Sequence, residues 1–378
     1  MRFRRAFSLL AGCFLLLATA AGAQEIHSQA QDFRVVTLTR VLDHPWALAF
    51  LPDGRMLVTE RPGRMRIVTK EGRVGEALKN VPAVQAGGQG GMLDVILDHD
   101  FARNRTIYFA YSERGEGGAG TAVARAVLGE SELRDNALSK VRVIYRQQPK
   151  VRGSLQFGAR IVQTADGDLF VTLGDRYLRD QAQDLDSGLG KIIRIRPDGS
   201  VPPDNPFVGK KGAQPEIWTY GHRSPEGAAL NPATGAFWMH EHGAQGGDEI
   251  NIIEPGKNYG WPVITWGIDY DGSKIGEGTS KAGMEQPIYY WTPSIAPSGM
   301  AFYTGDAFPK WKGNLFVGAL AGQMLVRVKV NGEKVVAQER LFEGKLGRIR
   351  DVREGPDGNL YLLTDEGDGA LIRVELAN

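Results

Sequence analysis

The stretch ARIVQTADGDLFVTLGD, residues 159–175, carries the pattern that decides the fold. In LFVTL (169–173), leucine and valine alternate with phenylalanine and threonine, which is the two-residue period of a β-strand. An Asp-Gly pair at 166–167 separates this strand from ARIVQ, and Asp-Gly is a strong signal for a β-hairpin. Another β-rich segment, KIIRIRPDG (191–199), follows. The stretch therefore predicts a hairpin that is continued by a further strand.

The same phrase recurs along the chain, as an apolar segment, a turn and a second β-rich segment. Its six versions cover residues 47–60, 92–112, 159–175, 227–241, 299–320 and 351–365. Repeats of two to four strands are typical of β-propellers, in which each repeat forms one blade. A large β-sandwich would not need the same hairpin six times. The sequence therefore predicts an all-β protein with the fold of a six-bladed β-propeller.

Two segments outside the repeats predict how the ring closes. FRVVTL (33–38) is a lone strand before the first repeat, and ALIRVEL (370–376) is a strand after the last hairpin. Pairing of these N- and C-terminal strands would close the ring and remove both free sheet edges. We therefore expect a single propeller domain over residues 33–378, preceded by a short linker at 24–32.

The composition limits the classes of partner. The 378 residues include 45 basic and 44 acidic side chains, for a net charge of +1. This balance argues against a nucleic-acid partner and against an anionic membrane surface. The 49 glycines and 19 prolines suit a turn-dense, all-β chain.

Residues 1–23 have the pattern of an export signal. Arginines, an apolar run and AGA (21–23) match a secretory signal peptide with an A-x-A cleavage site. A membrane anchor is the alternative, but an apolar run of about 18 residues is borderline for spanning. A lipoprotein signal at Cys13 ranks second, because the apolar stretch that follows it fits lipidation poorly. We expect a periplasmic or secreted protein that has no cysteine and no transmembrane anchor after cleavage.

Three loops contain more polar residues than turns require. Gln89 lies among four glycines, which let a backbone approach a ligand but also serve tight turns. Arg223 directly precedes a repeat, where it would meet an anion or a neighbouring blade. Arg348 and Arg350 are two residues apart, so in a strand they share a face. Two such arginines suggest a polyanionic ligand, and a solvated face is the other interpretation.

The segment HEHGAQGGDEINIIEPGKNYGWP (240–262) is the densest in chemistry. His240 and His242 suggest a transition-metal site, although such a site needs a third ligand. The carboxylates and glycines suit instead a hard cation that is bound by oxygen atoms. We favour calcium, held by backbone carbonyls near Gly243 and by side chains such as Glu249. NYGWP (258–262) is also consistent with a packed aromatic corner.

Eight segments stand in order along the chain: HPWALAFLPDGRMLVTERPGR, GGQGGMLDV, FVTLGDR, AQDLDSGLGKIIRI, EIWTYGHRSPEG, HEHGAQGGDEINIIEPGKNYGWP, SIAPSGMAFYTG and RIRDVREGPDGNLYLLTD. Together they resemble the soluble PQQ-dependent sugar dehydrogenases, the glucose/sorbosone and aldose sugar dehydrogenase family. The resemblance extends from about Phe33 to Leu376, and the fold it implies is a six-bladed propeller.

The resemblance implies a reaction. Members of this family oxidise C1 of an aldose to a lactone and pass a hydride to PQQ, which is held by calcium and arginines. A histidine accepts the proton of the C1 hydroxyl. The partners implied are therefore an aldose sugar and an electron acceptor that stays unidentified.

The resemblance also implies roles for individual residues. The expected cofactor contacts are Gln89, Arg223, Ser224, Tyr270, Arg348 and Arg350. The expected calcium ligands are the backbones of Gly243 and Ala244 and, at a second calcium site, Glu249 and Tyr259. Asp175 matches a carboxylate that supports the catalytic histidine.

Three positions depart from the family pattern. Ser224 stands where asparagine is usual, and Ala321 stands where some members carry a lysine against the cofactor. The third departure is QFGAR, in which Gln156 replaces the histidine of the family's HFGxR. An amide has no usable pKa near neutrality, so Gln156 cannot act as a general base. General-base catalysis is worth roughly 10²–10⁴-fold in rate, so we expect an impaired enzyme.

Three functions stay open at this point. The first is a slowed PQQ enzyme in which Asp175 accepts the proton, directly or through water. The second is a non-catalytic propeller that binds PQQ, a sugar or a partner. The third is a calcium-dependent hydrolase or lactonase, for which no specific motif is visible, since fold alone does not determine function.

Overall fold

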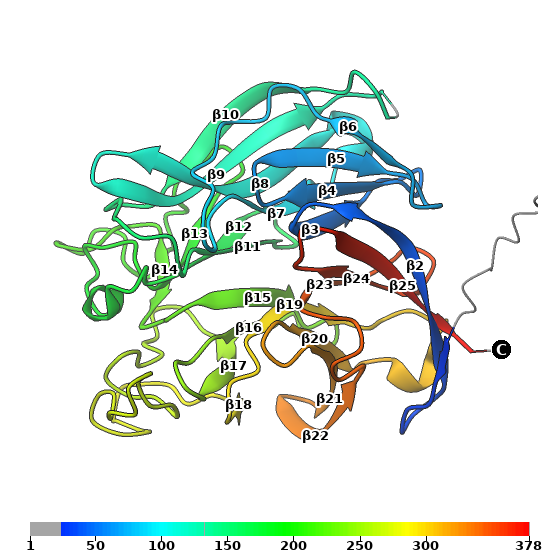
Figure 1. The fold of residues 1–378 in the computed structure, drawn as a ribbon. Helices are drawn as coiled ribbons and strands as arrows, with labels where there is room; N and C mark the ends of the chain where they lie inside the picture. The colour runs from blue at the N-terminus through cyan, green and yellow to red at the C-terminus, as the bar shows by residue number, and fades with distance from the viewer. Residues whose placement is uncertain (1–23, 132, 378) are drawn as a thin grey trace, which may run out of the picture.

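The computed structural model describes residues 24–131 and 133–377, and within them the chain forms six antiparallel sheets arranged in a ring (Figure 1). Blades one to three consist of β3 (Pro45–Phe50), β4 (Met56–Glu60), β5 (Arg64–Val68) and β6 (Val74–Ala77); β7 (Met92–Leu97), β8 (Thr106–Gly115), β9 (Gly118–Leu128) and β10 (Leu138–Arg146); and β11 (Gly158–Gln163), β12 (Leu169–Leu173), β13 (Lys191–Ile195) and β14 (Ile217–Tyr220).

Blades four and five consist of β15 (Pro225–Leu230), β16 (Phe237–Glu241), β17 (Asp248–Ile253) and β18 (Tyr289–Trp291); and β19 (Pro297–Phe302), β20 (Leu315–Ala319), β21 (Met324–Asn331) and β22 (Lys334–Leu341). The sixth sheet joins both ends of the chain and consists of β23 (Ile349–Glu354), β24 (Leu360–Thr364), β25 (Gly369–Leu376), β2 (Phe33–Leu42) and β1 (Gln24–Ile26). The predicted six-bladed β-propeller is confirmed. The helical segments between the strands are short: α1 (Phe101–Asn104), η1 (Arg179–Ala182) and η2 (Pro309–Trp311).

The predicted closure of the ring is also confirmed. β2 pairs antiparallel with β25, from Phe33 opposite Leu376 to Leu42 opposite Gly369. Figure 1 shows these two strands, one blue and one red, side by side. The segment 24–32, expected to be a linker, begins with β1, which pairs with β2 and extends the sixth sheet.

The alternation seen in LFVTL reflects packing on both faces of a blade rather than one buried and one exposed face. All five residues of β12 are buried. Leu169, Val171 and Leu173 pack in the apolar layer shared with the first and second blades. Phe170 points the other way and stacks on Phe237 of the fourth blade, with 4.6 Å between ring centroids. Each blade is therefore held by apolar contacts with both of its neighbours.

The first strand of each blade lies nearest the centre of the ring and contacts the first strand of the next blade (Figure 1). These inner strands are β3, β7, β11, β15, β19 and β23. We call the face of the ring where they begin the start face and the face where they end the end face. Each face has a cavity at its centre, and the two cavities share no lining residue.

A buried ionic layer separates the two faces. The Nη1 atom of Arg160 lies 3.1 Å from a carboxylate oxygen of Asp94 and 3.1 Å from one of Asp351. Arg353 pairs with the same two carboxylates, each at 2.8 Å. The Arg160 guanidinium also stacks over the Trp46 ring at 4.4 Å. Two arginines thus balance two aspartates, as buried charges require.

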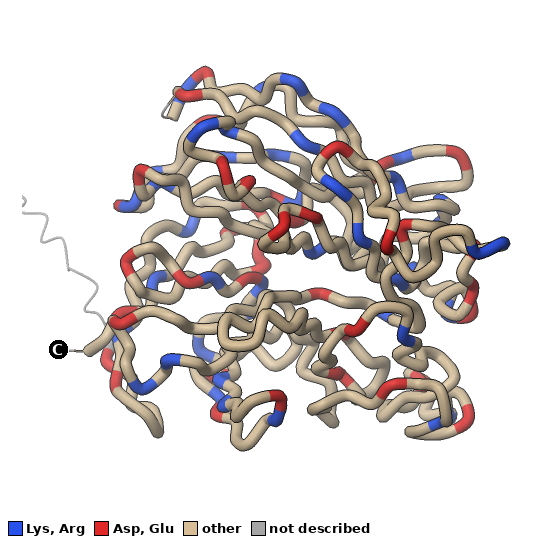
Figure 2. Tube along the Cα trace, turned by 180° about the vertical axis from the view of Figure 1, so that it is seen from behind, with Lys and Arg blue, Asp and Glu red and all other residues tan. Residues whose placement is uncertain are grey.

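Charges on the outside are mixed. Figure 2 shows basic and acidic positions interspersed around the ring, with no long run of one sign. Across residues 24–131 and 133–377, no helix combines the length and apolar character that crossing a bilayer requires. The signal peptide expected at residues 1–23 lies outside the described residues.

Candidate active site

A cavity of about 650 Å³ opens at the start face. This volume suits a small organic ligand. The residues expected at the site that line it are Gln89, Gly243, Ala244, Tyr270, Arg348 and Arg350. Ala321, one of the expected departures from the family pattern, also lies on its wall. The structure thus brings together side chains from loops that are far apart in the sequence.

Three arginines give this start-face cavity a cationic side. Arg348 is exposed, whereas Arg350 is buried and pairs with Glu226 and Asp365, each at 3.1 Å. Arg61 donates from Nη1 to the same Asp365 oxygen as Arg350, at 3.4 Å, and its Nη2 lies 3.4 Å from the second oxygen. Burial alone would raise the pKa of Asp365, but Arg350 and Arg61 lower it to about 2. Because three cations face two carboxylates, the wall keeps a positive charge that suits an anionic ligand.

The glycine-rich loop 86–94 docks on the turn that contains Gln156. The backbone amide of Gln89 donates to the Ser154 carbonyl at 2.7 Å, and the Gln156 amide donates to Oε1 of Gln89 at 2.5 Å. A Cβ atom at Gly88 would lie 2.5 Å from Oγ of Ser154, so the close approach of the two loops depends on glycine at this position. Gln89 therefore links the larger cavity to the Gln156 turn.

Gln156 is held in one orientation. Its backbone has φ of +55°, a left-handed conformation that is uncommon for residues with a Cβ atom. Its side chain is buried, and Oε1 accepts a hydrogen bond from the Tyr177 amide at 3.1 Å. A Cβ atom at Gly174 would lie 2.0 Å from the Gln156 carbonyl oxygen, so the following loop can pack here only with glycine.

Asp175 shares a small cavity with Gln156, and this cavity adjoins the larger one through Ala244 and Tyr270. The Asp175 carboxylate accepts hydrogen bonds from Nε1 of Trp261 at 2.7 Å and from the Tyr177 amide at 2.9 Å. Burial raises the pKa of this carboxyl to about 6, although the nearby Arg223 lowers it. A group that titrates near neutrality can exchange a proton with a bound molecule.

Two of the expected cofactor contacts lie behind the wall of the larger cavity. The buried Arg223 guanidinium donates to the His242 carbonyl and to the Tyr270 hydroxyl, each at 3.2 Å. Ser224 is fully buried, and its hydroxyl donates to Glu226 at 3.2 Å. Arg223 therefore lines the small cavity beside Asp175, whereas Ser224 lines neither cavity.

The loop with the first pair of expected calcium ligands is fixed by a carboxylate. Asp248 accepts hydrogen bonds from the Gly243 amide at 2.9 Å and from the Ile295 amide at 2.7 Å. These bonds hold Gly243 and Ala244 at the edge of the larger cavity. His242, on the same loop, donates from Nε2 to the Pro297 carbonyl at 2.6 Å.

The second pair of expected calcium ligands faces another carboxylate. Glu249 and Tyr259 line a very small cavity that also contains Gly243 and Glu241. Glu249 lies opposite Glu241 in the β16–β17 ladder. Burial and then the charge of Glu241 raise the pKa of Glu249 well above its usual range. Two carboxylates in this position repel each other unless a proton or a cation lies between them.

The structure gives no support to a transition-metal site at His240 and His242. His240 is fully buried in β16, and neither of its ring nitrogens has a hydrogen-bond partner. Within residues 24–131 and 133–377, three metal-ligating side chains converge instead at Glu25, His27 and Asp32. That group lies in the largely exposed N-terminal segment.

With the site described, comparison with known proteins becomes informative. A profile of the Glucose / Sorbosone dehydrogenase family matches residues 42–373, nearly the whole described chain. The chain belongs to this family. As a member of the glucose/sorbosone dehydrogenase family, the protein is an oxidoreductase.

Relatives support the assignment over their full lengths. The aldose sugar dehydrogenase YliI of Escherichia coli is 50% identical over 372 residues, which cover 97% of this chain and 99% of the relative. The apo crystal structure of the soluble E. coli aldose sugar dehydrogenase matches with a TM-score of 0.88 at 48% identity, covering 91% of this chain and 100% of that one. A PQQ-bound aldose sugar dehydrogenase from Streptomyces coelicolor matches with a TM-score of 0.75 at 28% identity, covering 91% and 98%.

Three residues of the candidate site could not be predicted from the sequence. Arg61 lines the larger cavity, but ERPGR looks like an ordinary charged turn between two strands. Trp261 hydrogen-bonds Asp175 from the corner at 258–262, which was assigned only to packing or to calcium. Tyr177 places its amide between Gln156 and Asp175. Because backbone donors have no residue-specific signal, the sequence contained no indication of this last contact.

Proposed function

We propose that this chain oxidises C1 of an aldose to a lactone, with PQQ as its cofactor and calcium as its metal, at a rate limited by Gln156. The observation that carries the proposal is the arginine-lined start-face cavity, which adjoins a buried carboxyl that titrates near neutrality. Membership of the glucose/sorbosone dehydrogenase family supplies the reaction class.

The residues of the start-face cavity fit PQQ. PQQ carries three carboxylates, and Arg61, Arg348 and Arg350 line the cavity. Nε of Arg350 is buried without a hydrogen-bond partner, so a ligand oxygen there would satisfy it. Gln89 and Tyr270 would complete the wall, and Arg223 would hold the Tyr270 hydroxyl in place by a hydrogen bond. When bound, PQQ supplies a quinone that accepts hydride from the sugar.

Calcium fits the oxygen-rich loop next to this cavity. The backbones of Gly243 and Ala244 would serve a cation at the cofactor, because hard cations prefer oxygen ligands. The opposed Glu241 and Glu249 carboxylates, with Tyr259 beside them, would hold a second calcium. A cation there would remove the repulsion that raises the pKa of Glu249.

The proton of the sugar hydroxyl would go to Asp175, directly or through a water molecule. Gln156 lines the same small cavity but can only hydrogen-bond. In this proposal Gln156 orients the hydroxyl and Asp175 holds the proton, because its pKa of about 6 leaves it ionised at neutral pH. The alternative function is a propeller that binds PQQ, sugar or a partner without turnover, and the absence of a histidine at 156 favours it.

Reconstitution separates these two functions. The mature protein and Gln156→His would be loaded with PQQ and calcium, titrated by absorbance, and assayed for dye reduction with a panel of aldoses. We expect both proteins to bind PQQ and Gln156→His to turn over roughly 10²–10⁴-fold faster. Turnover in Gln156→His alone would leave the natural chain as a binding protein. Failure of both proteins to bind PQQ would exclude the proposed enzyme and would point to a ligand other than PQQ.

We also propose that residues 1–23 are a signal peptide and that the mature chain, a single propeller, works in the periplasm or outside the cell. AGA at 21–23 is the motif that supports this location. N-terminal sequencing of the protein from the periplasmic fraction is expected to begin at Gln24. Recovery of the full-length chain from the cytosol would contradict the proposal.

A further inference from the structure

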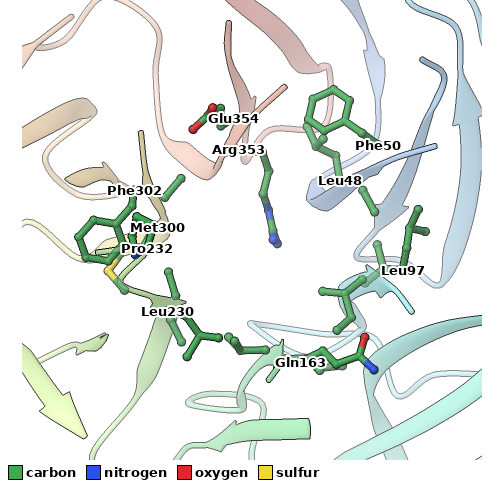
Figure 3. A pocket seen from close by; sticks show the side chains of 18 of the residues that line it. Leu48, Phe50, Leu97, Gln163, Leu230, Pro232, Met300, Phe302, Arg353 and Glu354 are labelled. Atoms are coloured by element: carbon green, nitrogen blue, oxygen red, sulfur yellow. The ribbon is translucent and has the colours of Figure 1, made fainter. Parts of the chain in front are cut away.

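The end-face cavity is distinct from the proposed active site and has a volume of about 470 Å³. It lies where the six inner strands end, and each of these strands contributes to its wall. Figure 3 shows Leu48, Leu230, Met300 and Phe302 around it. This cavity is open to solvent at the end face, and its ring of aliphatic and aromatic side chains suits the apolar body of a small ligand.

The floor of this end-face cavity is the ionic layer described above. The guanidinium of Arg353 extends into the middle of the cavity in Figure 3. Its ion pairs with Asp351 and Asp94 use Nε and Nη2. These two bonds fix the guanidinium plane, and the side chain keeps 23% of its surface exposed. Arg353 is therefore a rigid hydrogen-bond donor that faces a largely apolar, open cavity.

The charge around Arg353 selects the kind of ligand group. Asp94 and Asp351 are fully buried and are balanced by Arg353 and Arg160. Glu354 adds a negative charge at the rim, where it accepts hydrogen bonds from Thr304. An anionic ligand would meet this carboxylate without an excess cation to compensate, whereas a neutral oxygen needs only the donor.

Of the other polar groups at the rim, Gln163 is already engaged within the protein. The Gln163 amide donates to Asp98 at 3.2 Å and accepts from the His99 amide at 2.9 Å. His99, which is exposed, also lines the rim. Arg353 is thus the polar group best placed to determine which ligands bind at the centre of the cavity.

We propose that the end-face cavity binds a small, uncharged, ring-containing compound with a carbonyl oxygen, the carbonyl accepting a hydrogen bond from Arg353 and the ring packing on Leu48, Leu230, Met300 and Phe302. Ketones and quinones have this chemistry. The site does not depend on the proposed sugar oxidation, because the ionic layer separates it from the start-face cavity.

Three probes of similar shape test the proposal: acetophenone, which is neutral and has a carbonyl; isopropylbenzene, which lacks it; and benzoate, which is charged. The mature protein would be labelled with ¹³C in its methionine methyl groups, and the Met300 signal would be assigned with Met300→Leu. We expect acetophenone to shift the Met300 signal saturably and to bind about tenfold more tightly than either other probe, because one hydrogen bond to a charged donor contributes about that factor.

Two variants locate the interaction. Leu230→Trp fills the partly exposed mouth of the cavity and should abolish the shift, whereas Val336→Trp on the exposed face of β22 should leave it unchanged. Arg353→Lys keeps the charge but loses the fixed guanidinium donor, so acetophenone should then bind no better than isopropylbenzene. Thermal unfolding would check that each variant is folded. If Arg353→Lys does not fold, Leu230→Trp still tests whether the probe binds in this cavity.

The opposite results are equally clear. No shift of Met300 up to the solubility limit of acetophenone would overturn the site. Equal affinity for acetophenone and isopropylbenzene, or tighter binding of benzoate, would overturn the assignment of a neutral carbonyl ligand. A shift that persists in Leu230→Trp would place the probe elsewhere and would also overturn the site.

Discussion

Gln156 is a buried amide in a turn that is held from several sides. The turn has a left-handed backbone at Gln156, a hydrogen bond to Gln89 and a contact with the Tyr177 amide. The side chain at 156 has no proton-accepting group, but Asp175 lies in the same small cavity with a pKa of about 6. At the scale of residues, the proposed activity therefore depends on one carboxyl whose burial sets its proton affinity.

Asp175→Asn should stabilise the fold at alkaline pH and have no such effect in acid. The pKa of Asp175 rises from 3.8 to about 6 on folding, so the native state favours the protonated form. Stability due to this group is present below about pH 4 and is lost as the pH rises through about 6. A shift of about 2 pKa units corresponds to about 3 kcal/mol, which Asp175→Asn would recover at alkaline pH.

Urea unfolding at about pH 4 and about pH 8 measures this difference. Asp368→Asn is the control, because Asp368 is exposed. If the natural chain and Asp175→Asn lose stability in parallel as the pH rises, the carboxyl of Asp175 does not titrate as described. Dye reduction by the natural enzyme should rise over the same pH range and be lost in Asp175→Asn.

At the scale of elements, strands could be predicted and loops could not. The alternation in LFVTL and its Asp-Gly turn are local signals, and both follow from backbone geometry. The loop between β12 and β13 has no such period, yet it carries Asp175 and η1. What holds this loop is Lys191, whose ammonium donates to the carbonyls of Gln181 at 2.8 Å, Ala182 at 3.1 Å and Leu189 at 2.6 Å.

Lys191 acts as an internal cation for this loop, so Lys191→Met should loosen it. Its side chain is fully buried, and burial lowers its pKa to about 7. Methionine fills similar space but leaves the Leu189 carbonyl without a donor, whereas the Gln181 and Ala182 carbonyls keep the amides of Asp184 and Gly221. We expect the loss to cost about 1–3 kcal/mol of unfolding free energy. The Gln183 contact with Trp261 should weaken in turn, since η1 precedes it directly.

Urea unfolding and the turnover of the reconstituted enzyme measure the two effects. Lys211→Met removes an exposed lysine and should change neither. A stable Lys191→Met protein with unchanged turnover would mean that the three carbonyls hold the loop without the ammonium.

At the scale of the whole molecule, the number of repeats predicted the ring of six blades, but the ionic layer at the centre of the ring could not be predicted. Six hairpin phrases and two unpaired terminal strands are sufficient to predict a closed propeller. The ionic layer is different, because Asp94, Arg160, Asp351 and Arg353 belong to three blades, and each looks like an isolated charge in its own strand. Only closure of the ring brings them together, and that closure separates the two cavities.

Ile372→Pro should therefore affect more than the strand that contains it. Ile372 lies in β25, opposite Thr37 of β2 and Leu362 of β24, and is fully buried. Proline would remove a backbone donor and distort the central strand of the sheet that joins the ends of the chain, at a cost of about 3 kcal/mol or more. Val336→Pro is the matched control, because Val336 lies in the outer strand β22 and is 53% exposed. It falls at a register shift between Val335 and Ala337, where the strand pairing is already interrupted. If closure of the ring holds the end-face cavity together, Ile372→Pro should lower the unfolding midpoint and also weaken acetophenone binding there. A loss of stability equal to that of Val336→Pro would instead mean that the blades stand without the closing pair.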